Sequence, residues 1–500
     1  MSVPLKVIEG IVDASGAAEA IEQMLPEAAW DRQLTVRTLL AGMMLAMADG
    51  RPAHLTRVHQ ALTGLPEADQ RRLGVIADWK AGPHQLTYRQ VEHTFGLAAA
   101  ALGKHEPDGA PTAALQQACD ALLEASVPAA FRETSSSLAV DWTDLESWSR
   151  PPPHGSAICA DPEAHWGHRN SNLPGPKGER FFGYYISGVT MVPDENGQPV
   201  PELIRRMTVC SCAHDPAAAL VPVLQSMAAH GIKLGDILAD SGYSYRVPGT
   251  WAVPVRGTGA QLVIDLHTND RGPRGTHQGA VVCNGNLYCP ATPKPLLKLV
   301  PLPPGANGAD IAAHDQQTAE LARHKLGVHA SEDADGYRRH ACPAVIGKVR
   351  CRLRPPSMAL GRDRPEILTP PQRPPACCLQ QTITAGPDVA AKTRQKHDYP
   401  SAEWRRSYDR RTAAERLNST IKDTATTSIA RGWIRLMGLA PAMLWLACLL
   451  AVRNQRILTA WNKRQQDNAR RAAKGLPPAT RRKRRAVAAT PDMATASAPP

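Results

Sequence analysis

Residues 203–240 read LIRRMTVCSCAHDPAAALVPVLQSMAAHGIKLGDILAD. The apolar run at 203–211 predicts a buried strand, residues 216–229 predict a helix, and the run at 236–240 predicts a second buried strand. Asp215 is the expected N-cap of this helix, and Pro216 suits its first position. A sheet with helices packed on it is the natural way to bury this strand, helix and strand.

Three further apolar runs extend this pattern in both directions. LAVDW (138–142) and FFGYYISGVTMV (181–192) precede the quoted stretch, and LVIDL (262–266) follows it. The expected element order from residue 138 to residue 240 is therefore three strands, a helix and a strand. We predict an α/β fold class for this part of the chain.

The 500 residues are enough for about three domains. Residues 1–130 are expected to form an all-α domain with breaks near residues 50–52, 82–83 and 107–109, suited to DNA-end binding or to dimerisation. Residues 131–268 hold the sheet, and residues 269–400 form a loop-rich insertion in which Pro, Gly and Cys gather. Residues 401–462 return to helix, and residues 463–500 are expected to be a basic, disordered tail.

The net charge of +12 is concentrated at the C-terminal end, because residues 453–500 hold twelve Lys and Arg against two Asp. Such a block suits a polyanion, first nucleic acid and second an anionic membrane, whereas the alternative is a merely solubilising tail. The densest run is expected to contact DNA through Arg481, Arg482, Lys483, Arg484 and Arg485.

The N-terminal residues show no charged segment followed by an apolar run, so we expect a cytoplasmic protein without a secretory signal. Eleven Cys in a reducing compartment indicate free thiols or metal ligands, not a disulfide framework. Residues 436–452 carry no charge and are just long enough to raise the question of a membrane span. We expect a buried core helix there and no membrane partner.

Two carboxylates stand at the ends of predicted buried strands. Asp141 follows the apolar run LAV, and Asp240 follows ILA. Carboxylates side by side at the ends of neighbouring strands would form a site for a hard divalent cation such as Mg²⁺, which prefers oxygen ligands. The alternative is that each Asp simply begins a turn.

A helical projection of residues 408–422 gathers four side chains on one face. At 100° per residue, Tyr408, Arg411, Glu415 and Lys422 lie within a stripe about 60° wide. The carboxylate could hold metal while the cations meet phosphate oxygens, as a phosphodiester site requires. The alternative is a solvated face with ordinary ion pairs between successive turns.

The segments LAVDWTD (138–144), ILADSGYSY (237–245) and YDRRTAAERLNSTIK (408–422) resemble the three acidic motifs of DDE transposases of bacterial insertion sequences. The third segment matches the Y-x2-R-x3-E-x6-K signature at every defined position, and the resemblance covers roughly residues 135–450. It implies an RNase H-like catalytic core with a helical N-terminal domain and an insertion before the helix that carries the catalytic Glu.

The resemblance also implies the roles of the site residues. Asp141, Asp240 and Glu415 would be the catalytic triad and would bind two Mg²⁺ ions, with Mn²⁺ as a substitute. Contacts to the DNA backbone near the cleaved end would come from Tyr408, Arg411 and Lys422.

The implied function is a transposase that binds the terminal inverted repeats of its own element and catalyses metal-dependent end cleavage and strand transfer. Synapsis of two DNA ends implies a homodimer. The alternatives are a catalytically inactive, decayed or repurposed transposase that still binds DNA, and a general RNase H-like nuclease that needs no specific ends.

The cysteines of the insertion leave two interpretations open, a zinc site or free thiols. Structural zinc sites usually show pairs separated by two to four residues, and none of the pairs here does, so free thiols are favoured. The pairs are Cys283 with Cys289, Cys342 with Cys351, and Cys377 with Cys378.

Several other residues have a metal or binding interpretation that we consider weaker than a structural one. His165 and His168 are expected to be surface or hydrogen-bonded residues, and Asp144 and Glu146 are expected to lie in a turn. Trp251 is expected in the core, with base stacking at a DNA end as the alternative.

Overall fold

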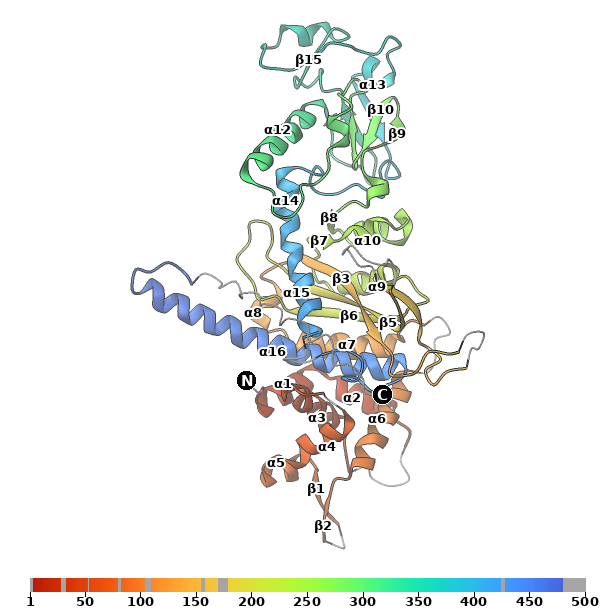
Figure 1. Cartoon of the computed structure of the whole chain (residues 1–500), viewed down its shortest axis with the longest axis vertical. Helices are drawn as coiled ribbons and strands as arrows, with labels where there is room; N and C mark the ends of the chain where they lie inside the picture. Colours follow the sequence, from red (N-terminus) through yellow and green to blue (C-terminus); the bar gives the residue numbers. More distant parts are fainter. Residues whose placement is uncertain are drawn as a thin grey trace, which may run out of the picture.

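The computed structural model describes residues 3–27, 33–52, 54–79, 82–103, 109–153, 158–169, 179–423 and 428–479. Figure 1 shows an elongated molecule with the N-terminal helices at one end, a sheet in the middle and residues 269–400 at the other end. The order along this axis follows the chain, except that the C-terminal helices return to the middle.

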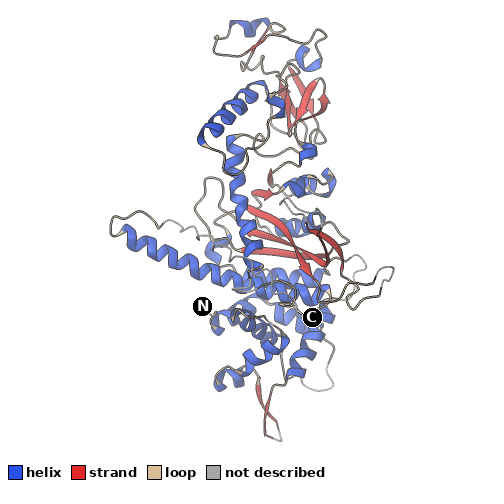
Figure 2. Ribbon diagram, in the orientation of Figure 1, coloured by secondary structure: helices blue, strands red, loops and turns tan. Residues whose placement is uncertain are grey.

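A mixed sheet of six strands forms the centre of the described chain (Figure 2). Its path is β4-β5-β3-β7-β8, and β6 pairs with the part of β5 that β4 leaves free. β3 runs parallel to β7, and β7 to β8, whereas β5 is antiparallel to β3. The strands are β3 (Leu138–Glu146), β4 (His165–Arg169), β5 (Glu179–Met191), β6 (Ile204–Ser211), β7 (Asp236–Ala239) and β8 (Gln261–Ile264).

The predicted strands and the predicted helix are all present, so the α/β fold class is confirmed. Helix α9 (Pro216–Ala229) has the expected bounds, and the Asp215 side chain caps it by accepting a hydrogen bond from the backbone N–H of Ala217 at 3.0 Å. Two differences concern β3, which continues four residues beyond the predicted run, and β4, which sequence reasoning missed.

Helices cover both faces of the sheet. The Ser187 hydroxyl donates a hydrogen bond to the carbonyl of Pro216, so Ser187 faces α9. The next residue, Gly188, faces Leu417 of α15 (Thr412–Ile421), because successive residues of a strand point to opposite faces. The connection from β7 to β8 consists of α10 (Ser241–Ser244), the 3-10 turn η1 (Pro248–Thr250) and α11 (Ala252–Gly257).

The N-terminal region is helical, but the all-α prediction is wrong in one place. Strands β1 (Ile76–Trp79) and β2 (Gly82–Gln85) form a two-stranded hairpin where the Gly-Pro pair predicted a connection between helices. Pro83 lacks an N–H and is tolerated in such an edge strand, while Gly82 supplies a φ of 111°. The helices are α1 (Leu5–Ser15), α2 (Ala17–Met24), α3 (Val36–Ala48), α4 (Leu55–Thr63), α5 (Glu67–Arg72), α6 (Tyr88–Leu102), α7 (Ala113–Ala125) and α8 (Ala129–Arg132).

The apolar segment after residue 436 lies in the long helix α16 (Leu439–Ala472), and the prediction of a buried core helix is confirmed. Buried Asn454 fixes α16 to the sheet by bonding the backbone N–H and C=O of Ile204 at 3.0 and 2.8 Å. Within the described ranges no helix has the length and apolarity needed to cross a membrane.

The prediction that the disordered tail starts at residue 463 is wrong, because α16 continues to Ala472. Lys, Arg, Gln and Ala favour helix, so the helix extends past the end of its apolar face. The five basic residues of the tail lie outside the described residues: Arg481, Arg482, Lys483, Arg484 and Arg485.

The N-terminal helices and α16 share one hydrophobic core with a face of the sheet. Trp445 of α16 is buried and packs edge-on against Phe95 of α6, with ring centroids 6.0 Å apart. Tyr184 of β5 and Met207 of β6 belong to the same buried cluster. The boundary expected at residue 130 is therefore not a break in the core.

The insertion between β8 and α14 (Ala402–Tyr408) is rich in loops and has only three small apolar clusters. Its longest helix is α12 (Gly308–His324). The remaining elements are β9 (Pro273–His277), β10 (Ala280–Cys283), β11 (Asn286–Tyr288), β12 (Gly327–Val328), β13 (Arg338–Ala341), β14 (Arg350–Cys351), β15 (Glu366–Ile367), α13 (Ala376–Leu379), β16 (Thr382–Ala385) and three 3-10 turns.

Candidate active site

The register of the parallel strands aligns two carboxylates. Ala139 of β3 pairs with Leu238 of β7, so two residues further along Asp141 is level with Asp240. Neighbouring strands lie about 4.8 Å apart, which brings the two side chains onto one edge of the β3–β7 pair. Asp141 and Asp240 are 99 residues apart in the sequence, and so are the paired residues Ala139 and Leu238.

Asp141 does not begin a turn, contrary to one of the two interpretations of the sequence. It lies inside β3, which continues to Glu146 by pairing with β5 after β7 has ended. Asp240 does end its strand, and its side chain caps α10 by accepting a hydrogen bond from the backbone N–H of Gly242 at 2.9 Å. The two carboxylates therefore have different backbone environments.

Asp141 faces helix α15. It pairs across the sheet with Gly188, which contacts α15, and its carboxylate accepts a hydrogen bond from the side-chain amide of Asn418 at 3.0 Å. Burial raises the pKa of Asp141 to about 6, with Arg411 opposing this shift and the charge of Asp240 adding to it. Burial also raises the pKa of Asp240, again against the influence of Arg411.

Arg411 places a positive charge among these carboxylates. Its guanidinium lies 2.7 Å from the Glu415 carboxylate and 3.7 Å from that of Asp240. Burial alone would lower the pKa of Arg411, but Tyr408 and the nearby acids hold it above its usual value. The Glu415 side chain is 60% exposed, so it can turn toward solvent or a ligand.

Tyr408 and Arg411 come from a nearly continuous helical run, in which α14 passes through the 3-10 turn η5 (Asp409–Arg411) into α15. The Tyr408 ring stacks on Trp404 with centroids 4.8 Å apart, and the Arg411 guanidinium lies 5.8 Å from the Tyr408 ring centre. The predicted stripe is therefore present for Tyr408, Arg411 and Glu415.

Lys422 lies at the C-terminal end of α15 and pairs with Asp144 of β3 at 2.6 Å. Asp144 also lies 2.9 Å from the guanidinium of Arg169, which contacts Glu146 as well. Burial alone would raise the pKa of Asp144, but Lys422 and Arg169 hold it below its usual value. The expectation of a turn at Asp144 and Glu146 is wrong, because both are in β3.

Sequence reasoning missed two residues of this site. Asn418 lies one turn after Glu415, and only its contact with Asp141 reveals its role. Asp265 follows β8, and the pairing of Ala239 with Ile264 makes it level with Asp240. The signal was available, because LVID repeats the pattern of LAVD and ILAD. Asp265 accepts a hydrogen bond from the Tyr399 hydroxyl at 2.8 Å and pairs with Arg271 at 3.2 Å.

Other residues have the structural roles expected from the sequence. The imidazole of His165 is hydrogen-bonded to the Ser211 hydroxyl at 2.7 Å, and the backbone N–H of His168 donates to the Tyr185 hydroxyl. Trp251 is 1% exposed and packs against Tyr243 with centroids 4.5 Å apart. It is thus a core residue.

The site offers carboxylate oxygens, which are the donor atoms that a hard divalent cation prefers. The adjacent carboxylates of Asp141 and Asp240 supply these oxygens. In the described residues no group of three or more His, Cys, Asp or Glu side chains is arranged to hold a metal as it stands. In this structure the positive charge beside the carboxylates of Asp240 and Glu415 is the guanidinium of Arg411.

No protein-family model, curated protein or solved structure matches this chain.

Proposed function

We propose that this protein is a DDE transposase, which binds the ends of its own mobile element and cleaves and joins phosphodiester bonds. The observation that carries the proposal is the register of β3 and β7 that makes Asp141 level with Asp240, with Glu415 on helix α15, which packs over β3 and β5. The two Asp motifs are thus spaced so that their carboxylates lie side by side on paired strands, which a chance motif match would not produce.

The sheet supports an RNase H-like core as part of this proposal. Its central strand β3 has the antiparallel β5 on one side and the parallel β7 and β8 on the other. Helices α9 and α15 pack on opposite faces. The chain order of three long antiparallel strands, a helix and a parallel strand is the order that the resemblance implies.

Asp141, Asp240 and Glu415 would hold Mg²⁺, or Mn²⁺ in its place. A bound divalent ion activates an attacking water or 3′-hydroxyl and stabilises the leaving oxygen of the phosphodiester. Asn418 would keep the Asp141 carboxylate oriented through its hydrogen bond. Arg411 would exchange part of its contact with Glu415 for a phosphate oxygen, and the roles proposed for Tyr408 and Lys422 are contacts to the DNA backbone.

DNA affinity would come mainly from the basic C-terminal residues, because phosphate contacts supply most of the sequence-independent binding. We propose a homodimer as the synaptic form. The site of action would be the cytoplasm, where the DNA of a bacterial element lies.

The decisive experiment is DNA cleavage in Mg²⁺ on a duplex that carries the inverted repeats flanking the reading frame. We expect the native chain to cut at the repeat boundary and the Glu415→Gln chain to lose cutting while it retains DNA binding. Glu403→Gln is the matched control, because Glu403 is an exposed glutamate on the preceding helix that pairs only with Arg406 among the described residues. Binding without cleavage by the native chain would instead identify a non-catalytic DNA-binding protein.

A further inference from the structure

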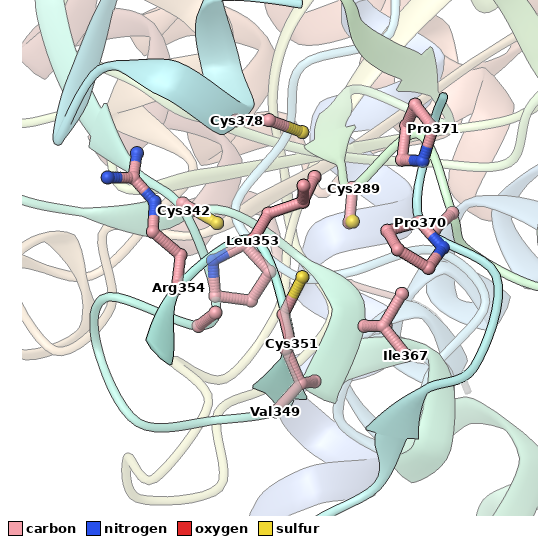
Figure 3. Close-up of a pocket in the computed structure, with 13 residues that line it drawn as sticks. Cys289, Cys342, Val349, Cys351, Leu353, Arg354, Ile367, Pro370, Pro371 and Cys378 are labelled. Atoms are coloured by element: carbon pink, nitrogen blue, oxygen red, sulfur yellow. The ribbon is translucent and has the colours of Figure 1, made fainter. Parts of the chain in front are cut away.

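Four cysteine side chains of the insertion point into one cavity (Figure 3). They come from four separate segments: Cys289 follows β11, Cys342 follows β13, Cys351 ends β14 and Cys378 lies in α13. All four are buried, and none is in a disulfide. The free space of the cavity is about 10 Å³, close to one water-sized sphere, so it can admit a single ion but not an organic ligand.

Three of these cysteines begin the same kind of tight turn. The carbonyl of each accepts a hydrogen bond from the N–H three residues later: Thr292 for Cys289, Val345 for Cys342 and Arg354 for Cys351, at 2.8 to 3.0 Å. Two of the turns start with the same tripeptide, Cys-Pro-Ala, at 289–291 and at 342–344. A repeated turn that directs its first side chain into a shared cavity indicates a common role for the cysteines.

Burial raises the pKa of Cys289 to about 12 and raises the pKa of Cys342, while backbone N–H groups of the same turns act in the opposite direction.

The surroundings of the cavity explain why a cross-link would matter. The insertion has only small apolar clusters, and one of them is built from Cys342, Cys351 and three neighbouring apolar residues. Segments without a sizeable core need a further constraint such as a metal or disulfides to hold one fold. The cavity lies where these segments meet.

We propose that Cys289, Cys342, Cys351 and Cys378 bind one structural Zn²⁺ ion. Soft thiolate sulfur selects zinc over magnesium, and four sulfurs complete the tetrahedral shell of a structural site. On binding, four thiols release four protons to solvent and four Zn–S bonds form without any change of oxidation state. No three of these thiols are arranged to hold a metal as they stand, so the side chains would have to turn inward to bring each sulfur to the Zn–S distance of about 2.3 Å.

Arg354 also lines the cavity and would offset the negative charge of a zinc–tetrathiolate centre. The Cys377 thiol lowers the pKa of Cys378, and Arg354 adds to this effect. The sequence disfavoured zinc because no cysteine pair has the usual spacing. The structure changes this interpretation because the ligands come from four segments and need no close pair.

The first test is the metal content of the purified full-length chain, measured by elemental mass spectrometry. We expect about one zinc per chain for the native protein and at least a fivefold loss for Cys289→Ser and Cys342→Ser. Cys283→Ser is the matched control, because the Cys283 thiol is buried in the same insertion but donates to the carbonyl of Leu297 and does not line the cavity. We expect it to retain zinc.

A second measurement does not depend on whether the variants fold. The native chain is stripped with a chelator under reducing conditions and titrated with Co²⁺, which should give thiolate-to-cobalt charge-transfer absorption and the visible bands of tetrahedral coordination, with an end point at one equivalent. Zinc should then bleach these bands. Absence of both zinc and a cobalt spectrum, or a disulfide between these cysteines in the native chain, would overturn the proposal. Neither measurement depends on DNA cleavage.

Discussion

The carboxylates Asp141 and Asp240 lie on paired strands of the central sheet, whereas the four cavity cysteines come from short elements joined by turns. The strand register fixes the carboxylates before any ligand binds, and burial makes their charges costly. In the insertion the candidate ligands are soft cysteine sulfurs, and the apolar clusters around them are small. The comparison teaches that strand pairing fixes one set of candidate ligands, whereas turns around a small core position the other set.

The largest effect should follow removal of metal from the insertion. Stripping the native chain of metal should speed tryptic cleavage within residues 269–400 at least tenfold, because binding free energy and folding free energy are the same quantity at such a site. The sheet segment 179–268 should keep its protection. Mass spectrometry of timed digests gives the cleavage rates of the insertion and of the sheet segment. An unchanged cleavage rate of the insertion would contradict a metal that stabilises this region.

Replacing Arg411 by Met should have the next largest effect. This change removes the positive charge beside Glu415 and Asp240, whose side chains are 60% and 32% exposed, so solvent screening limits the expected loss to about 2 kcal/mol in the free energy of unfolding. Added Mg²⁺ should stabilise Arg411→Met more than the native chain. Urea unfolding with and without Mg²⁺ measures this, with Arg406→Met as the exposed control. An equal Mg²⁺ effect in both chains would contradict a cation site at these carboxylates.

Asn418→Ala should lower DNA cleavage about tenfold to a hundredfold, because the proposed role of Asn418 is to orient the Asp141 carboxylate through its hydrogen bond. A positioning role predicts that the Mg²⁺ concentration for half-maximal cleavage rises while DNA affinity stays constant. Ser419→Ala, on the exposed side of the same helix, is the control. A loss of DNA affinity in Asn418→Ala would mean that Asn418 contacts DNA.

The smallest effect concerns Asp120 of α7, a partly buried carboxylate for which we propose no metal. Burial raises its pKa from 3.8 to about 6, so the unfolded chain loses this proton at a lower pH than the folded chain does, and the stability of the fold falls as the pH rises from about 4 to about 6. Asp120→Asn should therefore be more stable than the native chain by about 1 to 2 kcal/mol at pH 8 and nearly equal to it at pH 4. Unfolding in urea at both pH values measures the difference, and Asp363→Asn, which is exposed, should show no such dependence.

Much of the core could be predicted from the sequence. Helix α9 and strands β5 to β8 appear within a few residues of the expected bounds, because buried strands and a capped helix leave strong local patterns. The hairpin at 76–85 and the helical extension to Ala472 were missed. In both cases local signals for a break or for disorder were overridden by pairing or by helix propensity.

The site was predicted in part. Asp141, Asp240, Arg411 and Glu415 are brought together, but the contact of Lys422 with Asp144 and the role of Asn418 depend on how α15 crosses β3. No sequence rule gives that crossing, since it results from the close approach of Leu417 to Gly188.

The sequence by itself determined the strands, the helix between them and the carboxylates that follow apolar runs, because these features depend on neighbours within a few residues. Only the tertiary structure decided which carboxylates are level with one another and which cysteines share a cavity. Strand register and the meeting of four distant segments depend on packing between residues far apart in the chain, which local patterns do not record.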